Sequence, residues 1–109
     1  MAQDDMFVVM YKIIAYLYDC MKRGEEPRSE GWSASALGIP ETYWVQVVSE
    51  LVGHGLIGGV SIARTTMGST VLPSAPYVTM EGVQFAQENS MMNKAKRFLQ
   101  DAKAAIPFI

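Results

Sequence analysis

The sequence lacks an apolar stretch long enough to cross a membrane, since no run approaches the roughly 18 residues that a spanning helix needs. Cysteine is almost absent as well: the single Cys20 cannot form an internal disulfide, which favours a reducing compartment. Residues 1–5 are acidic and lack the basic region of a signal peptide. We therefore expect no membrane segment and a cytoplasmic location.

Charge is scarce too, at 18% of residues, and the net charge of −2 offers no general attraction to phosphate or to anionic lipid. Half of the residues are apolar, which is typical of a globular chain. A chain of 109 residues can bury a core without disulfides or metals. We find no repeat and no linker, so we predict a single domain over residues 1–109.

Residues that could carry catalysis or bind a metal are few. The only histidine, His54, lies in a glycine turn, and Cys20 lies on an apolar helix face, so neither has a partner for general-base or metal chemistry. Gly53, Gly55 and Gly58 match the dinucleotide-binding spacing, but there a helix precedes the glycines and a strand follows, which reverses the required order. We predict no catalytic, cofactor-binding or metal site, and no enzymatic activity.

Helical spacing of apolar residues predicts five helices, over residues 5–23, 33–37, 40–53, 80–89 and 91–105. The first helix ends at Gly24 and is followed by a charged turn from Glu25 to Glu30. We expect its inward face to carry Met6, Met10, Ile13, Ile14, Leu17, Cys20 and Met21.

The helix over residues 40–53 presents two different faces. One face carries apolar side chains that we expect in the core, extended beyond the helix by Leu56: Trp44, Val47, Val48 and Leu51. We expect the opposite face to carry Glu41, Thr42, Val45, Gln46, Ser49 and Glu50.

A two-stranded ribbon is expected over residues 56–79. The first strand covers Leu56 to Ala63, a long loop with its tip at Gly68 and Ser69 follows, and a second strand forms around Tyr77 to Thr79. The fold class is α+β and mainly helical: a winged helix-turn-helix core with a two- to three-stranded antiparallel wing and additional C-terminal helices.

The last helix carries a narrow apolar seam, and two large apolar residues follow Pro107. Two uses of this surface remain open: packing against the first helix, or self-association of the chain. We expect Ser90 to cap the helix, and the seam comprises Met92, Ala95, Leu99, Ala102 and Ile106.

Three short motifs carry a family resemblance: Gly-Ile-Pro-Glu at residues 38–41, Gly-Leu-Ile-Gly-Gly-Val at 55–60, and Val-Thr-Met-Glu-Gly at 78–82. In these motifs the chain resembles the YjcQ-like family of small bacterial and bacteriophage proteins. The resemblance implies a winged-helix fold and a phage or prophage setting. It implies no catalytic residue, because the family has no established biochemical activity.

A winged helix suggests DNA binding, but the charges argue against it. Residues 31–78 contain one basic residue, Arg64, against Glu41 and Glu50, whereas DNA affinity depends on several cations at the phosphates. We therefore favour a protein-interaction module, through an unknown partner or self-association, over the alternative of a DNA-binding transcriptional regulator. For that alternative the possible nucleic-acid contacts are Thr42, Gln46, Ser49, Arg64, Lys94, Lys96 and Arg97.

Overall fold

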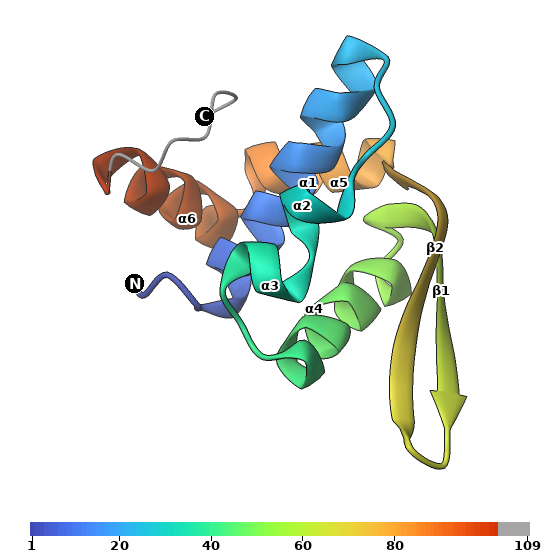
Figure 1. The fold of residues 1–109 in the computed structure, drawn as a ribbon. Coiled ribbons are helices and arrows are strands. Elements are labelled where there is room, and N and C mark those ends of the chain that lie inside the picture. Colours follow the sequence, from blue (N-terminus) through green and yellow to red (C-terminus); the bar gives the residue numbers. More distant parts are fainter. Residues whose placement is uncertain (103–109) are drawn as a thin grey trace.

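The computed structural model describes residues 1–102 and shows helices packed beside a two-stranded hairpin (Figure 1). The predicted class, α+β and mainly helical with a winged-helix layout, is confirmed, and the wing has two strands. The elements are α1 (Met6–Arg23), α2 (Ser29–Trp32), α3 (Ala34–Leu37), α4 (Glu41–Gly53), β1 (Ile57–Thr65), β2 (Gly68–Val78), α5 (Met80–Glu88) and α6 (Ser90–Asp101).

Helix α1 is the centre of the core, because α4, α5, α6 and β2 all pack against it. It ends at Gly24, which adopts the left-handed conformation with φ 67°. The prediction that Met6 and Met21 face inward is wrong, since both are exposed, Met21 at 48%. Both lie in the terminal turns of α1, and Met21 faces an open groove rather than another helix.

Between α1 and α4 the chain forms two short helices where the sequence predicted one. Ser29 and Glu30, expected to end the charged turn, form α2 together with Gly31 and Trp32. Ser33 has an extended backbone, and its Oγ accepts a hydrogen bond from the Ala36 N–H at 3.3 Å, so it ends α2 and caps α3. Gly38, with φ 69°, ends α3 before α4 begins.

The predicted inward face of α4 is confirmed, but one residue of the predicted outward face is buried. Trp44, Val47, Val48 and Leu51 are all buried. Val45 is buried as well, which corrects its prediction as an outward residue. The buried face is wider than a single stripe because α4 packs against α1 and also against both hairpin strands.

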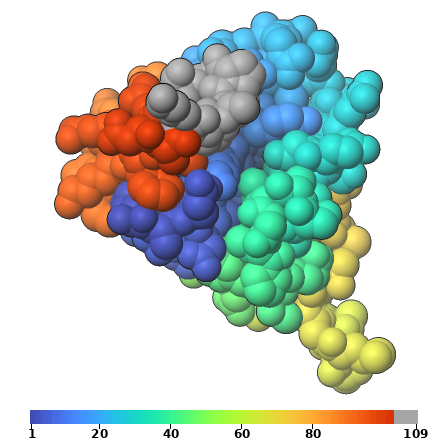
Figure 2. All heavy atoms as spheres, turned by 60° about the vertical axis from the view of Figure 1, so that its left-hand side comes forward, coloured from blue at the N-terminus to red at the C-terminus, as the bar shows by residue number. Residues whose placement is uncertain are grey.

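The predicted long loop after Ala63 is wrong, because β1 and β2 remain paired as far as Thr65 and Gly68. The tip is therefore Thr66 and Met67 rather than Gly68 and Ser69. Thr65 stabilises this turn: its Oγ1 donates to the Gly68 carbonyl at 2.9 Å and accepts from the Met67 N–H at 3.2 Å. The hairpin projects well beyond the helical body (Figure 2).

Helices α5 and α6 close the core from the other side of α1. The predicted packing of α6 on α1 is confirmed, and Met92, Ala95 and Leu99 are completely buried. The part of the predicted seam formed by Met92, Ala95 and Leu99 therefore packs within the chain, whereas Ala102 is exposed. Ile106 and the apolar residues after Pro107 lie outside the described residues, as does the predicted helix end at 105.

Side chains cap both of these helices. Thr79 is the N-cap of α5, and its Oγ1 accepts a hydrogen bond from the Gly82 N–H at 3.0 Å. The cap of α6 is Asn89 and not Ser90: Asn89 Oδ1 accepts from the N–H groups of Met91 and Met92 at 2.9 and 3.1 Å. Because the side-chain carbonyl of Asn89 accepts from two free N–H groups of the first turn, Asn89 is the cap and Ser90 is the first helical residue.

Candidate interaction surfaces

The outer face of α4 carries the residues that would read DNA bases in a helix-turn-helix protein. Thr42 and Gln46 are exposed and Ser49 is half-buried, so the structure brings these three together on one face. Glu41 and Glu50 are exposed on the same helix. No Lys or Arg occurs within α4 to offset their charge.

The N-terminal segment adds more negative charge beside α4. Tyr43 Oη donates a hydrogen bond to the Asp4 carbonyl at 2.7 Å, which fixes this segment next to the helix. Burial raises the pKa of Tyr43, and the negative charges of Asp4 and Asp5 raise it further. The surroundings of α4 are therefore unfavourable for a phosphate backbone.

The predicted basic contacts do not gather around α4. Arg64 is exposed near the far end of β1, whereas Lys94, Lys96 and Arg97 belong to α6, on the opposite side of the molecule in Figure 1. Lys94 and Arg97 are exposed, but Lys96 is half-buried and lines a cleft between helices. The seven candidates thus form no single surface.

We accordingly expect no submicromolar, salt-sensitive binding of duplex DNA through α4. A DNA reader draws much of its affinity from phosphate contacts, and α4 provides carboxylates instead. The measurement is fluorescence anisotropy of random and genomic duplexes, titrated with the protein at low and then at higher salt. Tight binding that is abolished by Gln46→Ala or Arg64→Ala would contradict this expectation. Binding lost only on changing Lys94, Lys96 and Arg97 would place the contact on α6 instead.

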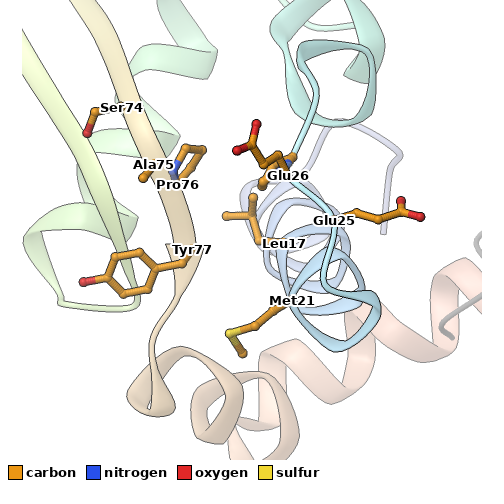
Figure 3. A pocket seen from close by; sticks show the side chains of 9 residues that line it. Leu17, Met21, Glu25, Glu26, Ser74, Ala75, Pro76 and Tyr77 are labelled. Atoms are coloured by element: carbon orange, nitrogen blue, oxygen red, sulfur yellow. The ribbon is translucent and has the colours of Figure 1, made fainter.

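A groove that the sequence did not predict lies between β2 and the chain that leaves α1 (Figure 3). One hollow, of about 310 Å³, lies between Met21, Glu25 and Glu26 on one side and Ala75 and Tyr77 on the other. A second hollow, of about 210 Å³, continues from it over Trp32 and Trp44. The two hollows share Pro27, Ser74 and Pro76, and we call them together the β2 groove.

A bulge in the hairpin shapes one wall of the β2 groove. Gly58 pairs with Tyr77 and Val60 with Pro73, so Gly59 lies opposite the three residues 74–76. Gly59 has φ 72°, and Ser74 Oγ donates to its carbonyl at 3.2 Å. The extra residues of β2 therefore bend outward, as bulged strands do. The signal for this bulge was present as Gly58-Gly59 opposite two prolines.

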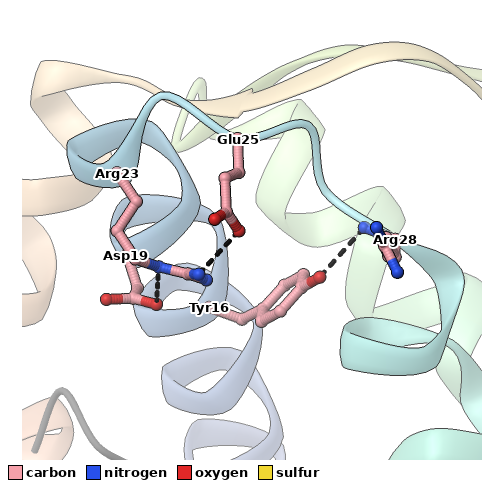
Figure 4. A network of polar contacts seen from close by, with 5 residues as sticks. All are labelled: Tyr16, Asp19, Arg23, Glu25 and Arg28. Atoms are coloured by element: carbon pink, nitrogen blue, oxygen red, sulfur yellow. Dashed lines mark hydrogen bonds and ion pairs between the residues drawn. The ribbon is translucent and has the colours of Figure 1, made fainter.

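The other wall is the turn after α1, held by three polar contacts that Figure 4 shows. Tyr16 Oη accepts a hydrogen bond from the Arg28 N–H at 2.9 Å. Arg23 bonds Asp19 at 2.9 Å and Glu25 at 2.6 Å. Burial is the main cause that raises the pKa of Tyr16, so the hydroxyl stays protonated at neutral pH. Contacts within the chain therefore hold this wall of the β2 groove in place.

Within residues 1–102, no group of three or more His, Cys, Asp or Glu side chains is placed to hold a metal ion. Cys20 is buried in α1, and His54 Nε2 lies 3.3 Å from Glu50 on an exposed surface. No helix of this part of the chain is long and apolar enough to cross a membrane.

Comparison with known proteins supports the resemblance seen in the motifs. No curated protein and no solved structure matches the chain. The model of one family, described as YjcQ protein, matches residues 11–105, which span α1 to α6. The chain therefore belongs to the YjcQ protein family.

Proposed function

We propose that this protein is a non-enzymatic interaction module that binds an extended segment of a partner protein in the β2 groove. The observation that carries the proposal is the groove itself, with apolar lining between two fixed walls. A cytoplasmic location and a phage or prophage setting accompany it as predictions. The charge around α4 makes this function a better fit than DNA-binding regulation.

The shape of the groove favours an extended segment over a helix or a compact ligand. Its two hollows share Pro27, Ser74 and Pro76, so a segment that fills both must run past these three residues. Met21 is about half exposed, at 48%, and its side chain points toward β2 in Figure 3, so it offers apolar surface to a partner. Aromatic and methionine side chains are the types that interfaces use most.

Side chains rather than backbone hydrogen bonds should hold the partner. The outer edge of β2 is unpaired among the described residues, which would suit the addition of a further strand. Pro73 and Pro76, however, have no N–H to donate, and proline on an edge strand hinders such pairing. A partner with apolar side chains for the hollows fits this wall better.

The groove also indicates the charge of the partner. Glu25 and Glu26 line it, and no Lys or Arg is found among the lining residues of either hollow. Glu25 is already bound to Arg23, whereas Glu26 makes no ion pair within residues 1–102. We therefore expect the bound segment to combine apolar residues with Lys or Arg.

Selection from a library of random linear peptides tests the proposal. We expect the selected peptides to be enriched in Lys or Arg beside apolar residues, and to lose most of their affinity for Met21→Ser and Glu26→Lys. Leu72→Ser is the control, because Leu72 is about as exposed as Met21, at 51%, but is not part of the groove. The Leu72→Ser variant should bind the peptides with the same affinity as the unchanged protein, as measured by fluorescence anisotropy.

Two results would count against the groove. Selected peptides that are acidic would show that Glu25 and Glu26 do not direct recognition. Peptides that bind the Met21 and Glu26 variants as well as the unchanged protein would place the contact elsewhere.

A further inference from the structure

A second cleft, unrelated to the β2 groove, lies between α1, α5 and α6 and has a volume of about 270 Å³. Its floor is aliphatic and includes Ile14 of α1 and Val83 of α5. Its remaining lining is rich in hydrogen-bond donors from three helices, namely Tyr11, Tyr18, Lys22, Gln87, Asn93 and Lys96. No carboxylate is among the lining residues.

The two lysines of this cleft come from different helices and lack acidic partners. Lys22 lies in the last turn of α1 with its Nζ 4.6 Å from the centre of the Tyr18 ring, and Lys96 lies on α6. Every ion pair within residues 1–102 involves Arg23 or His54 instead. Asp19, one turn before Lys22, is bound to Arg23 at 2.9 Å. The cleft therefore concentrates positive charge in a protein whose net charge is −2.

Tyr11 is a further donor at this cleft. It is only 7% exposed and lines the cleft, and its hydroxyl makes no hydrogen bond to another residue of the part described. Burial raises the pKa of Tyr11, so the hydroxyl keeps its proton at neutral pH and can donate it. The hydroxyl oxygen is not fully buried, so it can donate to water or to a ligand in the cleft.

From this arrangement we propose that the cleft binds a small phosphate monoester. Two lysines match the charge of a phosphate dianion, and the amide and hydroxyl donors suit its oxygens. The aliphatic floor would contact the organic part of the ester. A volume of about 270 Å³ lies near the lower end of ligand pockets, so the ligand is a small molecule.

The test is an NMR titration of the full chain with phenyl phosphate, compared with inorganic phosphate and phenol. We expect amide shifts confined to α1, α5 and α6, with tighter binding of phenyl phosphate than of either component alone. Lys22→Gln and Lys96→Gln should each weaken binding about tenfold. Lys94→Gln is the matched control, because it removes the same charge at an exposed position of α6, the helix that carries Lys96.

Each other outcome would overturn the proposal. Absence of shifts at the cleft, or equal weakening by Lys94→Gln, would show that no defined phosphate site exists. Duplex DNA that binds more tightly than phenyl phosphate, with the same dependence on Lys22 and Lys96, would assign the lysines to nucleic acid. Peptide binding in the β2 groove is measured separately, so either proposal can fail alone.

Discussion

Replacement of Trp44 with alanine should lower the free energy of unfolding by about 3–5 kcal/mol. The indole is buried between α4 and the chain after α1, with its ring centre 5.5 Å from that of Trp32. Its Nε1–H donates to the Trp32 carbonyl at 2.7 Å, a buried hydrogen bond that alanine cannot make. The loss therefore combines a cavity with an unpaired buried carbonyl. Denaturant melts measure it.

Gln46→Ala is the control for this experiment. Gln46 is exposed two residues further along the same helix, so its truncation should change stability by less than about 0.5 kcal/mol. A loss below about 1 kcal/mol for Trp44→Ala would mean that the indole contributes little to the core. Trp44→Phe should fall between the two, since it keeps the aromatic ring and loses the hydrogen bond.

Gly59→Ala should destabilise the protein by about 2–5 kcal/mol, because two costs add at this position. The backbone has φ 72°, a conformation that residues with a Cβ rarely adopt. A Cβ built there would lie 1.9 Å from the Ala75 carbonyl oxygen, which belongs to the backbone of the opposite strand and cannot easily move. We expect a lower melting midpoint and a changed β2 groove, which thermal unfolding and peptide binding would detect.

The Gly24→Ala variant measures the conformational cost of a positive φ without the steric cost. Gly24 has nearly the same φ, 67°, but no atom lies within 4 Å of a Cβ added there. It should therefore show only the conformational cost of about 1–2 kcal/mol. Equal losses for both variants would show that the hairpin accommodates the extra carbon, and that the bulge is softer than the structure indicates.

Periodic elements were predictable from the sequence because their signals are local. The apolar spacing in residues 5–23 and the glycine at 24 give α1 without knowledge of its partners. The buried face around Trp44 was found in the same way. The sequence did not show that Val45 is buried, because that depends on the hairpin packing beside α4.

Features that depend on distant segments were missed. The two-residue turn at Thr66 and Met67 follows from cross-strand pairing and from the hydroxyl of Thr65, neither of which a glycine-rich stretch reveals. The β2 groove was not predicted because its walls, at residues 21–27 and 74–77, are far apart in sequence.

The roles of helical glycines show the same difficulty. A Cβ on Gly53 would meet no atom within 4 Å, whereas one on Gly82 would lie 2.0 Å from the Leu56 carbonyl oxygen. The sequence presents both simply as glycines near helix ends. Only at Gly82 does the missing side chain allow two segments, the start of α5 and the chain entering β1, to approach closely.

The packing of α6 on α1 has a consequence for the order of events during translation. Met92, Ala95 and Leu99 cover a face of α1 that leaves the ribosome long before them. Until α6 emerges, the apolar face of the first helix lacks its cover, so a nascent chain cannot complete its core. Stable folding should therefore begin only when Leu99 has left the ribosome, and a chaperone that shields exposed apolar helices would act in that interval.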